Sequence, residues 1–280
     1  MTGATDRQWN SATTLYISRR LHEIAGGRAL AVLDLGCGAG KTLSHLLDSG
    51  LDLYGYDLVS GEDEYADDRR VRLLPHFGDR YASHIKVTQS ERDIPFADES
   101  FDVVYANQVF EHVRFLDRMV AECARVLRPG GVLLANFPLA TYPIEGHLRV
   151  PFAHWLPPGP LRVRYLQLWR ILGVMPGQAG RSSFDNAVDQ DRYLREHTFY
   201  RFMNEVMAVS DRYFENTEVE TTALVQAKID LMGSTGSGTR AMVAGVMRSL
   251  ERGGLLSTCV THMLNAAFCM RVPRKGRMSA

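Results

Sequence analysis

The amino-acid sequence predicts an α/β fold built on a doubly wound sheet. A mostly apolar run from Leu30 to Leu35 indicates a buried strand, and glycines follow it at the alternate positions 36, 38 and 40. An apolar-periodic segment begins near Lys41, so the order is strand, glycine-rich turn and helix. Alternating glycines let the chain turn sharply, and they let a ligand approach the backbone where a Cβ atom would clash.

Strand and helix patterns alternate along the rest of the chain, which supports one α/β domain with seven strands. Further strands are expected at 53–57, 85–88, 103–106, 132–137, 214–221 and 263–272, and helices at 11–24, 42–47, 116–127, 198–209 and 239–250. The sequence Pro129-Gly130-Gly131 is expected to stop the third of these helices, and Thr198 to cap the fourth. Residues 60–83 predict a short helix with loops, and 233–238 a flexible loop.

The glycine turn is compatible with three ligands. A dinucleotide fingerprint requires a third glycine at position 41, which is Lys41. A phosphate-binding P-loop fits Gly40-Lys41-Thr42 but requires its first glycine at position 35, which is Leu35. The third ligand is S-adenosyl-L-methionine (SAM), and Asp34 favours it. A carboxylate before the turn repels phosphate but suits a ligand with an ammonium and a sulfonium group.

An acidic residue ends the second predicted strand. Asp57 lies about twenty residues beyond the turn, the spacing at which a carboxylate meets ribose hydroxyls in α/β nucleotide sites. Taken alone, Asp57 is equally compatible with a solvated acid at a strand end. Together with the glycine turn, it favours a nucleoside ligand.

Composition limits the possible partners. The chain has 280 residues, 45% of them hydrophobic, and equal numbers of basic and acidic residues, 32 each. This balance predicts no nucleic-acid partner and no membrane partner, although a local patch stays compatible with it. Cys37, Cys123, Cys259 and Cys269 form no C-x-x-C pair and indicate reduced thiols. With a polar N-terminus and no long apolar run, these features predict a cytoplasmic protein.

Five segments between residues 28 and 138 resemble, in order and spacing, the motifs of class I SAM-dependent methyltransferases. The likeness is greatest to the small-molecule group called type 11. The segments are Val32–Gly40, Tyr54–Asp57, Asp93–Val104, Asn107–Val113 and Leu127–Gly131. The resemblance implies a Rossmann-like seven-stranded sheet whose last strand is antiparallel, with SAM as the cofactor.

The resemblance also implies which residues bind SAM. Asp93 is expected to accept a hydrogen bond from the adenine amine, with Ile94 against the ring; the alternative for Asp93 is a plain surface loop. Trp9 and Tyr16 are candidates for a lid over the cofactor, unless they simply pack their helix on the sheet. The expected SAM ligands are Asp34, Gly36, Cys37, Gly38, Gly40, Asp57, Leu58, Asp93, Ile94, Asn107, Gln108 and Tyr16.

A long segment after the fifth strand interrupts the regular pattern. It is rich in proline, histidine and arginine, and it is expected to lie above the carboxyl ends of the strands, where ligands of such sheets bind. It is therefore predicted to be a cap that binds the acceptor. The single domain divides into an N-terminal helical lid (1–27), a SAM-binding core (28–138), the cap (139–195) and a C-terminal part of the sheet with an inserted helix (196–280).

Three histidines are candidate catalytic bases. His112 follows the fourth strand, beside the expected methionine end of SAM, while His147 and His154 lie in the cap. A positioned histidine that removes a hydroxyl proton accelerates transfer by about 10²–10⁴-fold. The alternatives are that His112 orients its helix and that the cap histidines are structural. The spacing of Glu145, His147 and His154 fits no common zinc site, so no metal is predicted.

The turn after the fourth strand narrows the acceptor. Asn107-Gln108-Val109-Phe110 lacks the two prolines typical of methyltransferases that act on base or amide nitrogen. A small hydroxylated acceptor, a sugar or a secondary metabolite, is therefore predicted. Arg149, Arg162 and Arg164 are candidates to hold an acidic acceptor. Two other functions stay open, a non-catalytic SAM-binding protein and a P-loop-like nucleotide-binding protein. The oligomeric state is not predicted.

Overall fold

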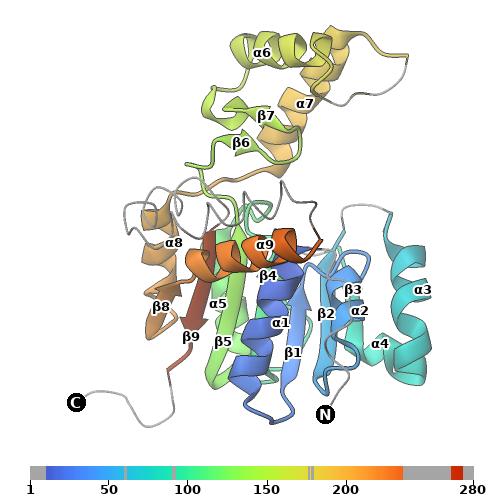
Figure 1. The fold of residues 1–280 in the computed structure, drawn as a ribbon, viewed down its shortest axis with the longest axis vertical. Coiled ribbons are helices and arrows are strands. Elements are labelled where there is room, and N and C mark those ends of the chain that lie inside the picture. The colour runs from blue at the N-terminus through green and yellow to red at the C-terminus, as the bar shows by residue number, and fades with distance from the viewer. Residues whose placement is uncertain are drawn as a thin grey trace.

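The computed structural model describes residues 11–59, 62–89, 93–175, 177, 180–235 and 266–273. Its centre is a seven-stranded sheet in the order β3-β2-β1-β4-β5-β9-β8 (Figure 1). The first five strands in this order are parallel, and β9 runs antiparallel to both of its neighbours. The strands are β1 Ala31–Leu35, β2 Asp52–Leu58, β3 Ile85–Thr88, β4 Phe101–Asn107, β5 Leu127–Phe137, β8 Asn216–Val219 and β9 Ala266–Arg271. The predicted α/β sheet with an antiparallel last strand is confirmed.

Helices cover both faces of this sheet. Alternate residues of β1 separate the two cores: Val32 packs with Leu21 of α1, whereas Leu33 packs with Val120 of α5. Both kinds of position are apolar because a parallel sheet is buried on both faces. The helices are α1 Ala12–Ala25, α2 Lys41–Leu46, α3 Ala66–Phe77, α4 Tyr81–His84, α5 Leu116–Val126, α6 Pro160–Ile171, α7 Ser183–His197, α8 Met203–Ser210 and α9 Thr221–Thr235.

Several predicted boundaries were wrong. Residues 66–84 are almost entirely helical, and Gly233 lies inside α9. Helix α5 ends at Val126, and Pro129-Gly130-Gly131 lies within β5. Thr198 follows α7 and donates its hydroxyl to the Leu194 carbonyl (2.6 Å); α8 begins only at Met203. The expected helix at 239–250 lies outside the described residues, as does Trp9.

Helix α1 packs on the sheet beside α9, as Figure 1 shows. The Ser11 side chain accepts a hydrogen bond from the Thr13 amide at its start, and Gly26, with φ +52°, ends it. Tyr16 is buried and donates its hydroxyl to the Glu220 carboxylate (2.7 Å). Burial and this carboxylate raise the pKa of Tyr16. Tyr16 therefore packs α1 against the start of α9. This agrees with the alternative in which Tyr16 packs its helix, as opposed to the one in which it forms a lid over the cofactor.

The cap lies beyond the carboxyl end of β5 (Figure 1). It contains a two-stranded hairpin, β6 Ile144–Glu145 and β7 Val150–Pro151, a 3₁₀ turn η2 at Ala153–Trp155, and helices α6 and α7. Its hydrophobic core is separate from the two cores of the sheet and includes Leu148, Val150, Ala153, Val163, Leu166, Ala187 and Leu194. Within the described residues, no helix is both long enough and apolar enough to span a membrane.

The cap is also held together by a buried ion pair. Arg162 of α6 donates to the carboxylate of Asp191 on α7 (2.6 Å), and both side chains are less than 10% exposed. The guanidinium also donates to the Asp191 carbonyl (3.1 Å). Arg162 therefore joins two cap helices; it also lines a cavity of about 820 Å³, and the hypothesis that it holds an acidic acceptor stays a prediction. Arg149 and Arg164 do not line the cofactor cavity described below.

Candidate functional site

A cavity of about 750 Å³ opens at the carboxyl ends of β1, β2 and β4. A smaller one of about 160 Å³ shares Gly36 and Tyr65 with it and is lined by Asp34, Cys37 and Asn107. The larger cavity is lined by Leu35, Gly36, Gly38, Tyr56, Asp57, Leu58, Tyr65, Gln89, Gln108, Val109, His112, Val113, Phe115, Arg118 and Met119. We call the part formed by Asp34, Gly36, Gly38 and Asp57 the donor end. We call the cluster of Glu111, His112, Glu145, His147 and Tyr200 the histidine end; of these residues, His112 lines the larger cavity.

The glycine turn forms the floor of the donor end. Gly36 has φ +75°, and a Cβ atom built on it would lie 2.5 Å from Cγ2 of Val109. The amides of Gly36 and Cys37 both donate to the Tyr56 carbonyl (2.8 and 3.1 Å). A P-loop instead points its free amides at phosphate oxygens. Because both amides already donate hydrogen bonds to a carbonyl of the neighbouring strand β2, the turn does not form a phosphate-binding nest.

Asp57 lies on the wall of the cavity, one residue beyond Tyr56, which pairs with Leu35 across the sheet. Its carboxylate accepts a hydrogen bond from the Leu58 amide (2.9 Å) and pairs with the Arg69 guanidinium (3.3 Å). Burial raises the pKa of Asp57, while Arg69 and the Leu58 and Gly38 amides counter that rise. These partners fix a charged carboxylate at the mouth of β2, where it can accept hydrogen bonds from two ribose hydroxyls.

Arg69 is a functional residue that the sequence did not indicate. Its side chain, from α3, is almost completely buried, and Nε donates to the Gly38 carbonyl (2.5 Å). Its other nitrogens pair with Asp63 (2.7 Å) and Asp57 (3.3 Å). Arg69 thus links the glycine turn to the acid that ends β2. The segment 60–83 has no apolar periodicity from which the position of Arg69 could be predicted, although the sequence shows acidic residues near it.

Asp34 provides a test of whether a cationic ligand fits the donor end. It is 3% exposed, and burial raises its pKa well above the ordinary value; the nearby Tyr105 hydroxyl only partly counters this. No arginine or lysine of the described chain forms an ion pair with it. A buried carboxylate without a cationic partner gains stability from a ligand ammonium. The residues therefore fit the amino-acid part of SAM.

Asn107 and Gln108 continue from Asp34 toward the histidine end. Both are joined to Asn136 of β5, which donates to the Asn107 side-chain oxygen (2.8 Å) and accepts from the Gln108 amide nitrogen (2.9 Å). Gln108 adopts φ +58°, a left-handed conformation that non-glycine residues rarely take. Gln108 lines the larger cavity and Asn107 the smaller one, and their expected contacts with the methionine end of SAM stay a prediction.

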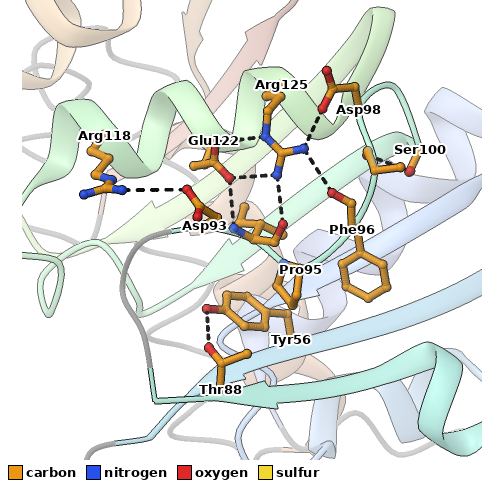
Figure 2. A network of polar contacts seen from close by, with 12 residues as sticks. Tyr56, Thr88, Asp93, Pro95, Phe96, Asp98, Ser100, Arg118, Glu122 and Arg125 are labelled. Atoms are coloured by element: carbon orange, nitrogen blue, oxygen red, sulfur yellow. Dashed lines mark hydrogen bonds and ion pairs between the residues drawn. The ribbon is translucent and has the colours of Figure 1, made fainter.

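The loop after β3 is fixed to helix α5 by a polar network (Figure 2). The Ile94 amide donates to Glu122 (2.9 Å), and its carbonyl accepts from Arg125 (2.8 Å). Ile94 is buried, whereas the Asp93 carboxylate is 72% exposed and pairs with Arg118 at 3.7 Å. Of these residues, Arg118 lines the cavity. The adenine contacts of Asp93 and Ile94 stay a prediction.

The histidine end combines the turn after β4 with the cap. His112 lines the cavity, and its Nδ1 donates to the His197 carbonyl (2.7 Å). Its Nε2 lies 3.1 Å from Nε2 of His147, whose Nδ1 lies 2.8 Å from the buried Glu145 carboxylate. Tyr200 and the Leu148 amide each donate to Glu145 (2.6 Å). The cap thereby supplies a buried acid behind the histidine pair.

This geometry fixes how protons are distributed. Each histidine donates its Nδ1 proton, His112 to a carbonyl and His147 to a carboxylate, so both Nε2 atoms are free to face each other. Two lone pairs at 3.1 Å repel, so the pair holds one shared proton. The hydrogen bond to Glu145 raises the pKa of His147, while burial lowers that of His112. These directions favour His147 as the donor and His112 as the acceptor of the hydrogen bond between the two Nε2 atoms.

Two further titratable groups, Glu111 and His154, lie near the histidine pair or in the cap. Glu111 is buried, its Oε2 has no hydrogen-bond partner, and burial raises its pKa to about 7. The His154 ring packs at a tilt of 39° against Tyr200, and both residues line a separate cavity of about 820 Å³ between the cap and the α7–α8 segment. The structure thus joins His112 with His147 and separates His154 from them. In the described residues, no group of three potential ligands is arranged to hold a metal ion.

The fold and the donor end resemble those of class I SAM-dependent methyltransferases. Comparison with known proteins agrees: residues 33–135 match the family model described as "Methyltransferase domain". The chain is 33% identical over 129 residues to an uncharacterized methyltransferase of Mycolicibacterium gilvum, a match that covers 46% of this chain and 47% of that protein. It is also 33% identical over 104 residues to a ubiquinone biosynthesis O-methyltransferase of Mesorhizobium japonicum, covering 37% and 39%.

These curated relatives are matched over less than half of their own length. A solved SAM-dependent methyltransferase of Mesorhizobium loti aligns over 94% of this chain and 98% of its own, with 14% identity and a TM-score of 0.49. The sequence matches centre on the segment that carries the glycine turn, β2 and β4.

Proposed function

We propose that the protein transfers the methyl group of SAM to a hydroxyl oxygen of a small-molecule acceptor bound between the sheet and the cap. The observation that carries the proposal is the single cavity with Asp57 on one wall and His112 on another. The first holds a nucleoside and the second receives a proton. The name of the Mesorhizobium japonicum relative, an O-methyltransferase, supports oxygen as the methylated atom.

The residues of the donor end would hold the cofactor by charge and shape. Asp34 would receive the ammonium, Asp57 the two ribose hydroxyls, and the bare backbone at Gly36 and Gly38 would allow close approach. Cys37 and Leu58 would contribute backbone and apolar contacts, and Gly40 the turn into α2. SAM supplies an electrophilic methyl group on a cationic sulfur. Because methyl transfer is an in-line displacement, holding the two reactants in line is worth about 7–11 kcal/mol.

The histidine end would handle the proton of the acceptor. Neutral His112 Nε2 is the basic atom nearest the cavity, and it exchanges its hydrogen bond to His147 for one to the acceptor hydroxyl. The Glu145 carboxylate keeps His147 in place through Nδ1, and the hydroxyl proton goes to His112 Nε2, which makes His112 an imidazolium whose Nδ1 proton is donated to the His197 carbonyl. Tyr200 and Leu148 hold Glu145 in turn.

A two-stage experiment tests the proposal. Thermal unfolding is first followed with SAM, S-adenosylhomocysteine, NAD and ATP, and only the first two are expected to stabilise the protein. Labelled SAM is then incubated with a metabolite extract, where the label is expected in a small molecule. Stabilisation by ATP alone would contradict a SAM site. Stabilisation by SAM without any transfer would support a non-catalytic SAM-binding protein instead.

The base is tested by His112→Ala with His76→Ala, an exposed histidine of α3, as the control. We expect His112→Ala to lower turnover by about 10²–10⁴-fold and to leave SAM affinity almost unchanged, because a general base acts on the acceptor. Turnover is measured at saturating SAM, and affinity by calorimetry. Weaker SAM binding with unchanged turnover would remove His112 from the role of base.

A further inference from the structure

The outward side of helix α6 is apolar. Its exposed side chains recur at helical spacing, and Leu161, Leu168 and Ile171 are 63%, 52% and 66% exposed. Phe184, at the start of α7, meets the Arg164 guanidinium of α6 at 5.5 Å, which extends the same surface. We call this surface the outer cap face; it consists of Leu161, Arg164, Leu168, Ile171, Leu172 and Phe184.

Helix α6 already buries its other side. Val163 and Leu166 point into the core of the cap, and Arg162 forms the buried pair with Asp191. A helix at the surface of a globular protein normally carries polar residues on the side that faces water. A contiguous exposed apolar patch marks a surface for binding another body. The outer cap face therefore has the composition of an interface, and α6 lies at the extremity of the molecule in Figure 1.

The charge of the surrounding segment is entirely positive. Residues 146–184 contain five arginines and no acidic residue, although the chain as a whole has a formal net charge of zero. The next acid along the chain is the exposed Asp185, and two of the five arginines are paired with acids of α7, Arg162 with Asp191 (2.6 Å) and Arg181 with Asp189 (2.5 Å). Apolar side chains with arginines around them are the pattern of helices that lie in the headgroup region of anionic membranes.

A second copy of the chain is a poorer fit to this surface. A two-fold contact through the outer cap face would bring the same face of both copies together. The Arg164 side chains and the acid-free segments would then approach each other, and like charges oppose such a contact. An anionic lipid surface instead offers phosphate groups to the arginines and acyl chains to the leucines.

We infer that the outer cap face binds an anionic lipid surface. Helix α6 lies along the headgroups, with Leu161, Leu168 and Ile171 inserted and Arg164 at the phosphates. This inference concerns binding alone and does not depend on methyl transfer. Because the cap lies beyond the carboxyl end of β5, such binding would turn that end of the sheet toward the lipid (Figure 1).

Co-sedimentation of the full chain with vesicles tests the inference. We expect binding to phosphatidylcholine vesicles that contain about 30% phosphatidylglycerol to exceed binding to pure phosphatidylcholine by about tenfold, and to fall as salt rises from about 0.1 to about 0.5 M. Leu168→Asp and Ile171→Asp should each reduce binding by about tenfold, and Arg164→Glu should remove the preference for anionic vesicles.

The matched control is Val71→Asp on α3, which places the same charge at an apolar side chain that is 77% exposed. It should bind vesicles as the parent protein does. Circular dichroism melts confirm that each variant folds, and none of these positions lines the SAM cavity. Equal vesicle binding by the parent and Leu168→Asp overturns the inference. The inference is also overturned if the parent protein binds no vesicles and light scattering shows a dimer that Leu168→Asp separates.

Discussion

The donor end and the histidine end of the cavity are built in different ways. The donor end comes from consecutive parts of the chain, since Asp34, Gly36 and Asp57 lie within 24 residues and on adjacent strands. The histidine end joins His112 to residues of the cap and of the segment after α7, up to 88 positions away. At the donor end Arg69 pairs with Asp57, whereas the histidine end contains Glu111, whose pKa burial raises to about 7.

The two ends should therefore respond to different kinds of mutation. Local strand and turn geometry fixes the donor end, so a change of backbone there should abolish cofactor binding. The histidine end depends on contacts between distant segments, so changes there should act on turnover and on pH dependence. Mutations at the two ends can therefore test whether cofactor binding and turnover depend on separate groups of residues.

Gly36→Ala should remove SAM binding. The new Cβ atom would lie 2.5 Å from Val109 and force a left-handed residue at φ +75°, so SAM affinity should fall by at least about 3 kcal/mol. Gly50→Ala is a matched control, since Gly50 has φ +76° with nothing within 4 Å of the added atom. Calorimetric titration with SAM measures both. Near-normal affinity in Gly36→Ala would show that the turn is not the cofactor floor.

Glu111 should make stability depend on pH. Burial raises its pKa from 4.5 to about 7, so the folded protein keeps a proton that the unfolded chain releases above pH 4.5. Stability should therefore fall between about pH 4.5 and 7, by up to about 3 kcal/mol. Urea unfolding at both ends of this window measures the fall, which Glu111→Gln should largely remove. Glu62→Gln, at an exposed acid, should leave it as in the parent protein.

Asp57 and Asp63 share Arg69 but should differ in effect. Asp57→Ala removes a carboxylate that lines the cavity and should weaken SAM binding by about 1.5–3 kcal/mol, the range for hydrogen bonds to a charged group. Asp63→Ala removes the other partner of Arg69, which does not line the cavity, and should affect SAM less. Equal losses in both variants would mean that Asp57 acts through Arg69 alone.

Asp93 should show the smallest effect at the donor side. Its carboxylate is 72% exposed, and its ion pair with Arg118 spans 3.7 Å, so the pair adds little to stability. If Asp93 accepts a hydrogen bond from adenine, Asp93→Ala should weaken SAM binding by about 0.5–1.5 kcal/mol. Asp98→Ala, at an exposed acid that pairs with Arg125, is the control. Identical SAM affinities in the two variants would assign Asp93 to the plain surface loop.

The sequence predicted the sheet and most of the donor end because their signals are local. The glycine turn, Asp34 and Asp57 follow from strand and turn patterns within two successive strands. The same reasoning missed Arg69, since it pairs with a carbonyl and with acids in a segment without apolar periodicity. Helix boundaries at 127 and 198 were wrong because a glycine pair in a strand and a threonine after a helix resemble capping signals.

Long-range contacts explain what the sequence left open at the histidine end. His112 and His147 were both candidates, but their 3.1 Å contact and the roles of Glu145 and Tyr200 depend on how the cap folds over the sheet. His154 is also a histidine of the cap and is close to His147 in sequence, yet it lines another cavity. Tyr16 was expected above the cofactor, and its hydrogen bond to Glu220, 204 positions away, gave no sequence signal.

The cap has a hydrophobic core of its own and joins the sheet through only two stretches of chain, one leaving β5 and one entering α8. An element attached in this way can be exchanged for another without altering the register of any strand. Related proteins could thus differ in their acceptors by carrying different caps, while the residues that bind the methyl donor stay the same.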